Sequence, residues 1–215
     1  DTGLYTNALK IIDMIITTST AITAVFMPRL SYYYVNNRKE FTKLVKNGNK
    51  ILSFLTFPLA IGLFVVAPNV VKILFGAEFI ESATIIRVLS IMIIIKGFGN
   101  LLCFQLVMCT GNEKERIPAT FFGSLSNVVM NAAFIPLFAG VGAAIASVVS
   151  EAIVNGYQLI KIKKVIDIQF EKKILIKCVI SSIIMGIVCY FIGKIKIETL
   201  ISTAITVLIG IVTYI

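Results

Sequence analysis

Charged and amide side chains recur at helical spacing inside the long apolar runs of this chain. Lys96 and Asn100 lie four residues apart, and Glu151 and Asn155 repeat that spacing in a later run. Four residues make about one turn of an α-helix, so each pair is expected on one helical face. A lysine at the centre of a membrane helix costs about 2.5–3.5 kcal/mol on insertion scales. Lys96 is therefore expected to meet a carboxylate or water, and Glu151 is the candidate partner.

Two more polar stripes lie in other apolar runs. Asn127 and Asn131 share one helical face, and Lys10 and Asp13 lie at the start of the first run. For the asparagines, Asn155 included, hydrogen bonds between packed helices are an equally good interpretation. Lys10 and Asp13 could also form a local pair near the membrane surface, with the lysine reaching toward water. Taken together, inward-facing lysines and amides suit an anionic cargo rich in hydroxyl groups.

Several kinds of chemistry lack their residues in this chain. It contains no histidine, and its four cysteines lie in apolar runs without metal-ligand spacing. It also contains no GxxxxGK[ST] phosphate-binding loop. We therefore expect no metal, no cofactor and no enzyme activity. A membrane-embedded glycosyltransferase or acyltransferase would need clustered acids or histidine, and the expected outer loops offer only Glu78, Glu81 and Glu198.

The elements that carry these residues are expected to be membrane-spanning helices. The chain is 58% hydrophobic, has a mean hydropathy of +0.95 and lacks tryptophan, which is too apolar for a soluble core of 215 residues. About 20 apolar residues cross a bilayer as a helix. The sequence therefore predicts an all-α polytopic bundle of seven spans, at residues 11–27, 51–75, 85–108, 117–138, 141–160, 174–193 and 199–215.

The distribution of basic residues predicts an orientation. Thirteen of the 20 lysines and arginines fall in segments 28–50, 110–117 and 161–173, whereas the alternate loops contain two. By the positive-inside rule, the basic segments are expected in the cytoplasm and the start of the chain outside. The net charge of +9 then suggests contact with anionic lipid rather than with nucleic acid. Segment 28–50 is expected to be a loop containing an amphipathic helix at the inner surface.

Some strings of this sequence resemble a known family. The chain begins with Asp1 and ends within an apolar run, so we expect an interior or C-terminal piece of a longer protein. From residue 3 to about 164 it is similar to the C-terminal half of bacterial polysaccharide flippases, which belong to the superfamily of multidrug, oligosaccharidyl-lipid and polysaccharide exporters. The resemblance rests on GLYTNALKIID, FMPRLSYYYVNN, VVKILFGAEF, NVVMNAAFIPLFAGVGAAIAS and VVSEAIVNGYQLIK, and it is weaker from residue 172.

The resemblance implies a transporter with two helical bundles that form a V around a central cavity. Residues 1–160 would be the remaining helices of the C-terminal bundle, 161–173 a basic cytoplasmic loop, and 174–215 additional spans. The implied cargo is an oligosaccharide on undecaprenyl pyrophosphate, flipped across the cytoplasmic membrane by alternating access for capsule, O-antigen or exopolysaccharide synthesis. Implied partners are membrane lipid, the missing N-terminal bundle and, beyond them, a polysaccharide polymerase and glycosyltransferases.

Together with this resemblance, the polar residues inside the apolar runs are expected to have the following roles. Lys96, with Lys10 as second candidate, would neutralise the pyrophosphate or an acidic sugar. Asp13 and Glu151 would bind a coupling proton or sodium ion, because a carboxylate in a low-dielectric cavity favours both. A cation-coupled multidrug exporter of the same fold is the alternative, disfavoured by the mid-span lysine. The residues expected to line the cavity are Asn100, Asn127, Asn131 and Asn155.

Overall fold

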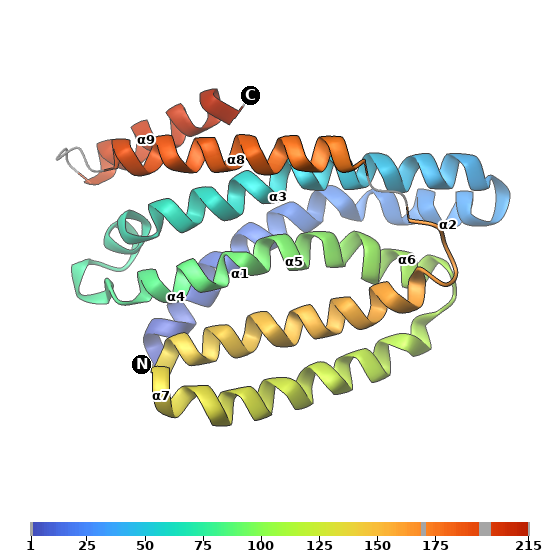
Figure 1. Ribbon diagram of the computed structural model, residues 1–215, viewed down its shortest axis with the longest axis horizontal. Coiled ribbons are helices and arrows are strands. Elements are labelled where there is room, and N and C mark those ends of the chain that lie inside the picture. The colour runs from blue at the N-terminus through green and yellow to red at the C-terminus, as the bar shows by residue number, and fades with distance from the viewer. Residues whose placement is uncertain (1, 169–170, 194–198, 215) are drawn as a thin grey trace.

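The computed structural model describes residues 2–168, 171–193 and 199–214, and this part of the chain is helical without any strand. The expected all-α class is therefore confirmed. Figure 1 shows long helices running back and forth along one axis. The α-helices are α1 (Thr2–Ala24), α2 (Phe26–Asn36), α3 (Arg38–Leu74), α4 (Ser82–Leu89), α5 (Ile91–Gly99), α6 (Leu106–Cys109), α7 (Arg116–Ile162), α8 (Lys172–Ile192) and α9 (Thr199–Tyr214).

Three short elements join these helices. Two are 3-10 turns, η1 (Ala77–Phe79) and η3 (Glu113–Glu115), and the third is the π-helical segment η2 (Asn100–Gln105) between α5 and α6. Glu78 and Glu81 are exposed at and beside η1, whereas Glu198 lies outside the described residues.

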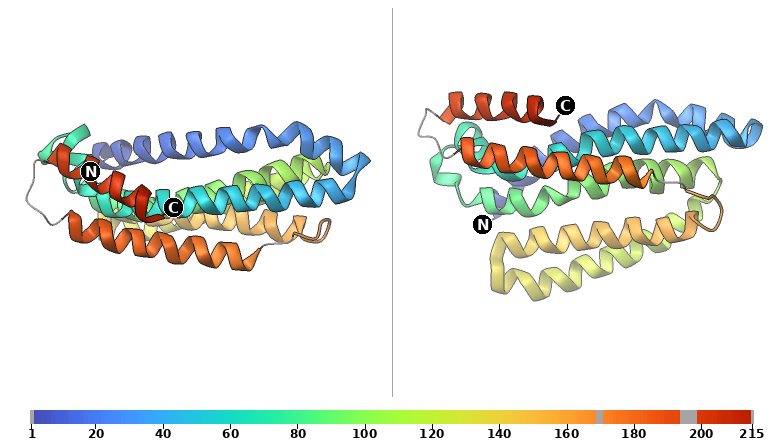
Figure 2. Two further views of the ribbon diagram at one scale, coloured as in Figure 1. Left: turned by 90° about the horizontal axis from the view of Figure 1, so that it is seen from above. Right: turned by 45° about the horizontal axis from the view of Figure 1, so that its top comes forward.

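Among the described residues, five helical stretches are long and apolar enough to cross a membrane. The longest contains α7, whose course reverses at Ala139, where φ is 49° and ψ is −126°. Its two arms, 116–138 and 140–162, run antiparallel in both Figure 1 and Figure 2. The apolar part of α9, Thr203–Tyr214, is shorter than a bilayer crossing. The chain is a multi-pass membrane protein, and the count of seven spans stays a prediction.

Segment 28–50 differs from the expected loop. It is helical except at Asn37, so that α2 and the first turns of α3 form a hairpin. Asn37 is extended, and its side-chain oxygen accepts a hydrogen bond from the backbone N–H of Glu40 at 3.2 Å, which caps α3. Tyr34 packs edge-on against Phe41 with ring centroids 5.3 Å apart. Leu30, Phe41 and Val45 of this segment are buried, whereas Tyr32 and Val35 are exposed. The position of the segment at the inner membrane surface stays a prediction.

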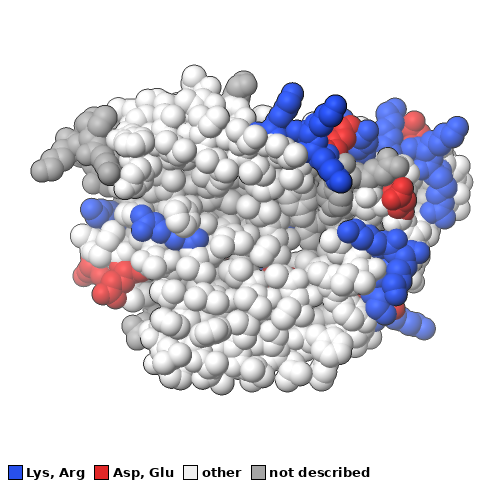
Figure 3. Space-filling model, viewed as in Figure 1, with Lys and Arg blue, Asp and Glu red and all other residues white. Residues whose placement is uncertain are grey.

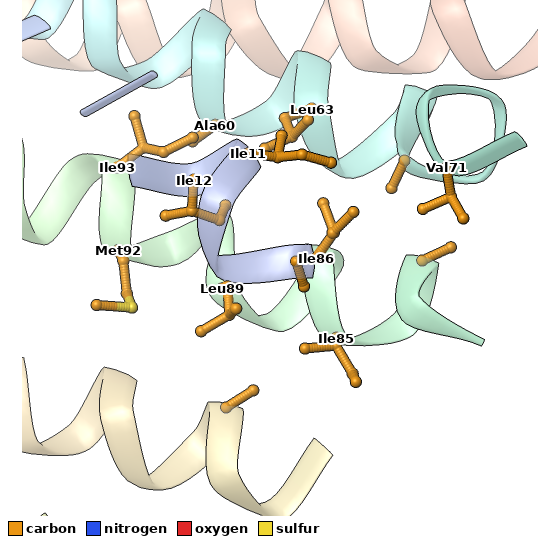
Figure 4. Packing of buried hydrophobic residues seen from close by; sticks show 14 of the residues in the cluster. Ile11, Ile12, Ala60, Leu63, Val71, Ile85, Ile86, Leu89, Met92 and Ile93 are labelled. Atoms are coloured by element: carbon orange, nitrogen blue, oxygen red, sulfur yellow. The ribbon is translucent and has the colours of Figure 1, made fainter. Parts of the chain in front are cut away.

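Two apolar clusters hold the bundle together. One joins α1, α3, α4 and α5 through fully buried side chains such as Ile12, Ile86 and Ile93, which Figure 4 shows pointing toward one another. The other joins α2, α3 and the segment from Leu101 to Val107. Residues 94–100, which include Lys96, fall between the buried residues of the two clusters along the chain. The polar residues Lys96 and Asn100 of this segment therefore belong to neither apolar cluster.

Helix α8 packs along α3, and α9 packs along α8 (Figure 2). An ionic cluster secures the beginning of α8: the carboxylate of Glu171 lies 2.6 Å from Lys46 Nζ and 3.1 Å from Lys50 Nζ, both on α3. Hydrogen bonds from these two ammonium groups, that of Lys46 first, lower the pKa of the Glu171 carboxyl below its ordinary value of 4.5. The ion pairs therefore favour the docked α8 only while Glu171 is ionised.

The Glu171→Gln variant is expected to lower the melting temperature by about 1–2 °C near neutral pH, because exposed ion pairs contribute little. A lowered pKa stabilises the folded state above 4.5, and this contribution disappears as the pH falls through the lower, folded-state value. Thermal unfolding of wild type and variant from about pH 7 to about pH 3 should give curves that converge at the acidic end. Glu113→Gln is the matched control, since Glu113 is exposed and forms no ion pair with another described residue. A difference that persists at acidic pH would contradict this mechanism.

Charge divides the molecule along its long axis. In Figure 3 most lysines and arginines gather at one end, and the middle of this face is uncharged. The basic end contains the α2–α3 hairpin and the ends of α7, where Arg38, Lys43, Lys161 and Lys163 lie. Large apolar side chains such as Val128 and Phe191 are exposed between the ends. An uncharged belt with one basic end is typical of a protein embedded in a bilayer.

Candidate functional site

The π-helical segment η2 places two polar side chains of α5–α6 together. Asn100 begins the segment and Gln105 ends it. In an α-helix, residues five apart point about 140° away from each other, whereas the wider π-helical turn brings them close to one face. Gln105 Nε2 accordingly donates a hydrogen bond to Asn100 Oδ1 at 2.9 Å. The π-helical segment thus orients the Asn100 side chain through its hydrogen bond with the buried Gln105.

A cavity of about 350 Å³ lies beside this segment, between α1, α5–η2 and α7. Its size is within the range of small-ligand sites. Side chains from helices far apart in the sequence meet here, because both α1 and the second arm of α7 pack against α5. The lining residues are Ile16, Thr20, Lys96, Gly99, Asn100, Phe104, Arg116, Glu151, Val154, Asn155 and Gln158.

The cavity contains two cationic side chains and one carboxylate. Lys96 and Glu151, the pair suggested by the sequence, both line it, but no ion pair joins either of them to another described residue. Glu151 Oε1 instead accepts a hydrogen bond from Asn155 Nδ2 at 3.1 Å. Both lysine and glutamate therefore meet a polar cavity, and the ammonium group of Lys96 is available to a ligand.

Arg116 is a cavity residue that the sequence reasoning missed. In the sequence it is one of the basic residues of segment 110–117, whereas in the structure it begins α7 and lines the cavity. Its guanidinium carbon lies 4.5 Å from the centre of the Phe104 ring, a cation–π arrangement that holds the side chain against η2. A sequence signal existed, because Arg116 directly precedes an apolar run, but only packing shows which way it points.

The remaining predicted site residues do not reach this cavity. Asn127 and Asn131 lie on the first arm of α7 and bond to each other, with Asn131 Nδ2 donating to Asn127 Oδ1 at 2.9 Å. Lys10 and Asp13 are exposed on α1, and neither forms an ion pair with another described residue. The structure thus gathers four of the eight predicted residues, namely Lys96, Asn100, Glu151 and Asn155.

Comparisons with known proteins agree with this architecture. Residues 1–84 match the family described as "Polysaccharide biosynthesis protein". Over 99% of its length the chain superposes on lipid II flippase MurJ in an inward closed conformation, with a TM-score of 0.84 and 20% sequence identity. The resemblance to polysaccharide flippases is confirmed. The structural likeness establishes the fold.

A second relative resembles the chain in sequence. The probable low-salt glycan biosynthesis flippase Agl15 of Haloferax volcanii is 22% identical over 214 residues, which is 99% of this chain. The chain covers 45% of Agl15 and 45% of the MurJ chain, so it spans about half the length of the proteins it matches.

Proposed function

We propose that this chain forms half of a transporter that flips an oligosaccharide linked to undecaprenyl pyrophosphate across the cytoplasmic membrane by alternating access. The cavity beside η2 is the observation that carries the proposal. It opens between apolar helices and yet contains Lys96, Arg116 and three side-chain amides. Polar groups at membrane depth cost free energy unless they face water, protein or a polar cargo. The printed functions of the flippases that the chain resembles support the same class of cargo.

The charges favour an anionic cargo. Lys96 and Arg116 together exceed Glu151 by one positive charge, and neither cation is engaged by a carboxylate of the described residues. A pyrophosphate diester has two negative charges, and a guanidinium can bind phosphate oxygens in a bidentate fashion. The amides of Asn155 and Gln158 offer both donors and acceptors to sugar hydroxyls. A cationic drug would be repelled by this arrangement, which disfavours the multidrug exporter.

The orientation and the coupling ion belong to the same proposal. The basic end of the molecule would lie in the cytoplasm, where Arg116 would meet cargo entering from the inner leaflet. Glu151 would bind the coupling proton or sodium ion, since it lies in the cavity and a bound cation would change the net charge seen by the cargo. Asp13, exposed on α1, is the second candidate. Lys10, Asn127 and Asn131 would face cargo from surfaces outside this cavity.

Flipping by the full-length protein in vesicles tests the proposal. An oligosaccharide on undecaprenyl pyrophosphate should become accessible to a membrane-impermeant enzyme that modifies sugars, and the same oligosaccharide on an uncharged lipid should not. An excess of a lipophilic cationic drug should leave the rate unchanged. Equal flipping of charged and uncharged lipids, or drug-driven competition, would contradict the proposed cargo.

A further inference from the structure

A buried hydrogen-bond network behind the cavity connects η2 with the end of α1. Gln105 is almost completely buried, and its Nε2 donates both to the Thr23 carbonyl oxygen and to Asn100 Oδ1, each at 2.9 Å. Thr23 is also buried, and its hydroxyl lies 3.0 Å from the same Asn100 oxygen and 2.9 Å from the Thr20 carbonyl oxygen. Asn100 lines the cavity near Lys96, and Thr20 lines it as well, whereas Gln105 and Thr23 lie behind it.

The chemistry of the network determines which way each amide points. The Thr23 carbonyl can only accept, so Gln105 must direct its NH₂ group there. The second hydrogen of that NH₂ group then requires an acceptor, which Asn100 supplies as Oδ1. The reverse orientation of Gln105 would set its oxygen against a carbonyl oxygen and strand two donors. The Thr23 carbonyl oxygen on α1 therefore fixes the orientation of the Gln105 amide, which in turn fixes that of the Asn100 amide.

The free end of Asn100 is consequently a donor. Its Nδ2 forms no hydrogen bond with another described residue, because the hydrogen bonds of Asn100 all use Oδ1. Lys96 precedes it by one helical turn, and Arg116 lies in the same cavity. All three groups can only donate from these atoms. These three groups thus offer only donors to a ligand.

We infer that Gln105 and Thr23 are positioning residues that lock the Asn100 amide with its NH₂ group toward the cavity, so that the site selects the pyrophosphate oxygens of the cargo. The inference rests on the proposed function and deepens it. Neither positioning residue need touch cargo: Gln105 is absent from the cavity lining, and so is Thr23. The π-helical turn is what brings Gln105 under Asn100, so the segment serves specificity.

Substitutions in the full-length protein test the orientation by thermal unfolding. Asn100→Asp should keep the melting temperature within about 2 °C of wild type, because the Gln105 amide already donates to the retained oxygen. Asn100→Leu should lower it clearly, because the buried Gln105 NH₂ group loses that acceptor, whereas the Thr23 hydroxyl keeps the Thr20 carbonyl oxygen. Thr18→Val, at an exposed site on α1, the helix that also contains Thr23, is the control. A large loss of stability in Asn100→Asp, equal to that of Asn100→Leu, would overturn the orientation.

Binding of inorganic pyrophosphate and of undecaprenyl pyrophosphate, measured by calorimetry, tests the selection. Gln105→Glu places carboxylate oxygens where Asn100 Oδ1 needs donors, so Asn100 should turn over and both probes should bind about tenfold more weakly. Thr23→Ser should bind like wild type, and Thr23→Val should bind several-fold more weakly. Unchanged binding in Gln105→Glu would overturn the inference.

The reference variant Lys96→Met separates this inference from the proposed function. If wild type binds both probes and Lys96→Met does not, the proposed site stands whatever Gln105→Glu does. If wild type binds neither probe, the proposed function fails and the selection by Asn100 fails with it. The melting temperatures of the two Asn100 variants still decide the orientation in that case.

Discussion

Replacing Lys96 with methionine in the full-length protein is expected to abolish polysaccharide export while leaving normal amounts of protein in the membrane. Methionine keeps the length of the side chain and removes the ammonium group, so the cavity charge falls from one net positive charge to none. A hydrogen bond to a charged group contributes about 1.5–3 kcal/mol, which corresponds to a loss of binding of about 10- to 150-fold. Lys96→Glu should be more severe, because a second carboxylate would repel phosphate.

Surface polysaccharide and membrane protein should be measured in the same cells for this prediction. Lys72→Met is the matched control: Lys72 is exposed in the last turn of α3, outside the cavity. Its export should equal that of wild type. Lys96→Arg should retain much of the activity, since it keeps a cation at the same position. Normal export by Lys96→Met would remove the lysine from the transport mechanism.

Gly142→Ala is expected to give the second largest effect, a loss of about 1–3 kcal/mol of stability. Gly142 lies just after the reversal of α7, and an added Cβ would meet backbone atoms of Phe134, including its carbonyl carbon at 2.6 Å. Backbone cannot move aside as a flexible side chain can. The first arm of α7 has few other anchors, since only Ala119 and Gly123 are buried along it. Separating the arms would also displace Arg116 from Glu151, which lines the same cavity from the second arm.

Gly156→Ala provides the comparison within the same arm. An added Cβ at Gly156 meets no atom within 4 Å, and alanine in a helix interior is favoured over glycine by about 1 kcal/mol. Thermal unfolding in one detergent should therefore show a lower melting temperature for Gly142→Ala and an equal or higher one for Gly156→Ala. A similar fall in melting temperature for both variants would indicate that this arm of α7 does not tolerate alanine in general, and not that the turn before Gly142 is tightly packed.

Much of the site could be expected from spacing alone. Lys96 with Asn100, and Glu151 with Asn155, repeat at four residues, and a helix necessarily places such pairs on one face. The free-energy cost of charge in a membrane then demands a polar environment, which both pairs find in one cavity. Helical spacing does not tell which polar face of one helix packs against which polar face of another. Asn127 and Asn131 have the same spacing, and they bond to each other within one arm of α7 instead of lining the cavity.

Segment 28–50 shows a different limit of local patterns. Apolar residues among lysines predict an amphipathic helix but not its neighbour. Asn37 divides the segment into two helices, and Phe41 buries its ring against Tyr34 across the hairpin. The hairpin removes the Phe41 side chain almost completely from water, which favours this packing. Nothing in the order of residues distinguishes the two outcomes.

The order of residues by itself determined that this is a helical membrane protein with one basic end, because apolar length and charge placement act through the bilayer, which every segment meets independently. Only the tertiary structure decided that Arg116 joins Lys96 in the cavity and that Gln105 turns the Asn100 amide. Those relations depend on the antiparallel arms of α7 and on one π-helical turn. Contacts between distant helices follow from packing of whole surfaces, which no local spacing specifies.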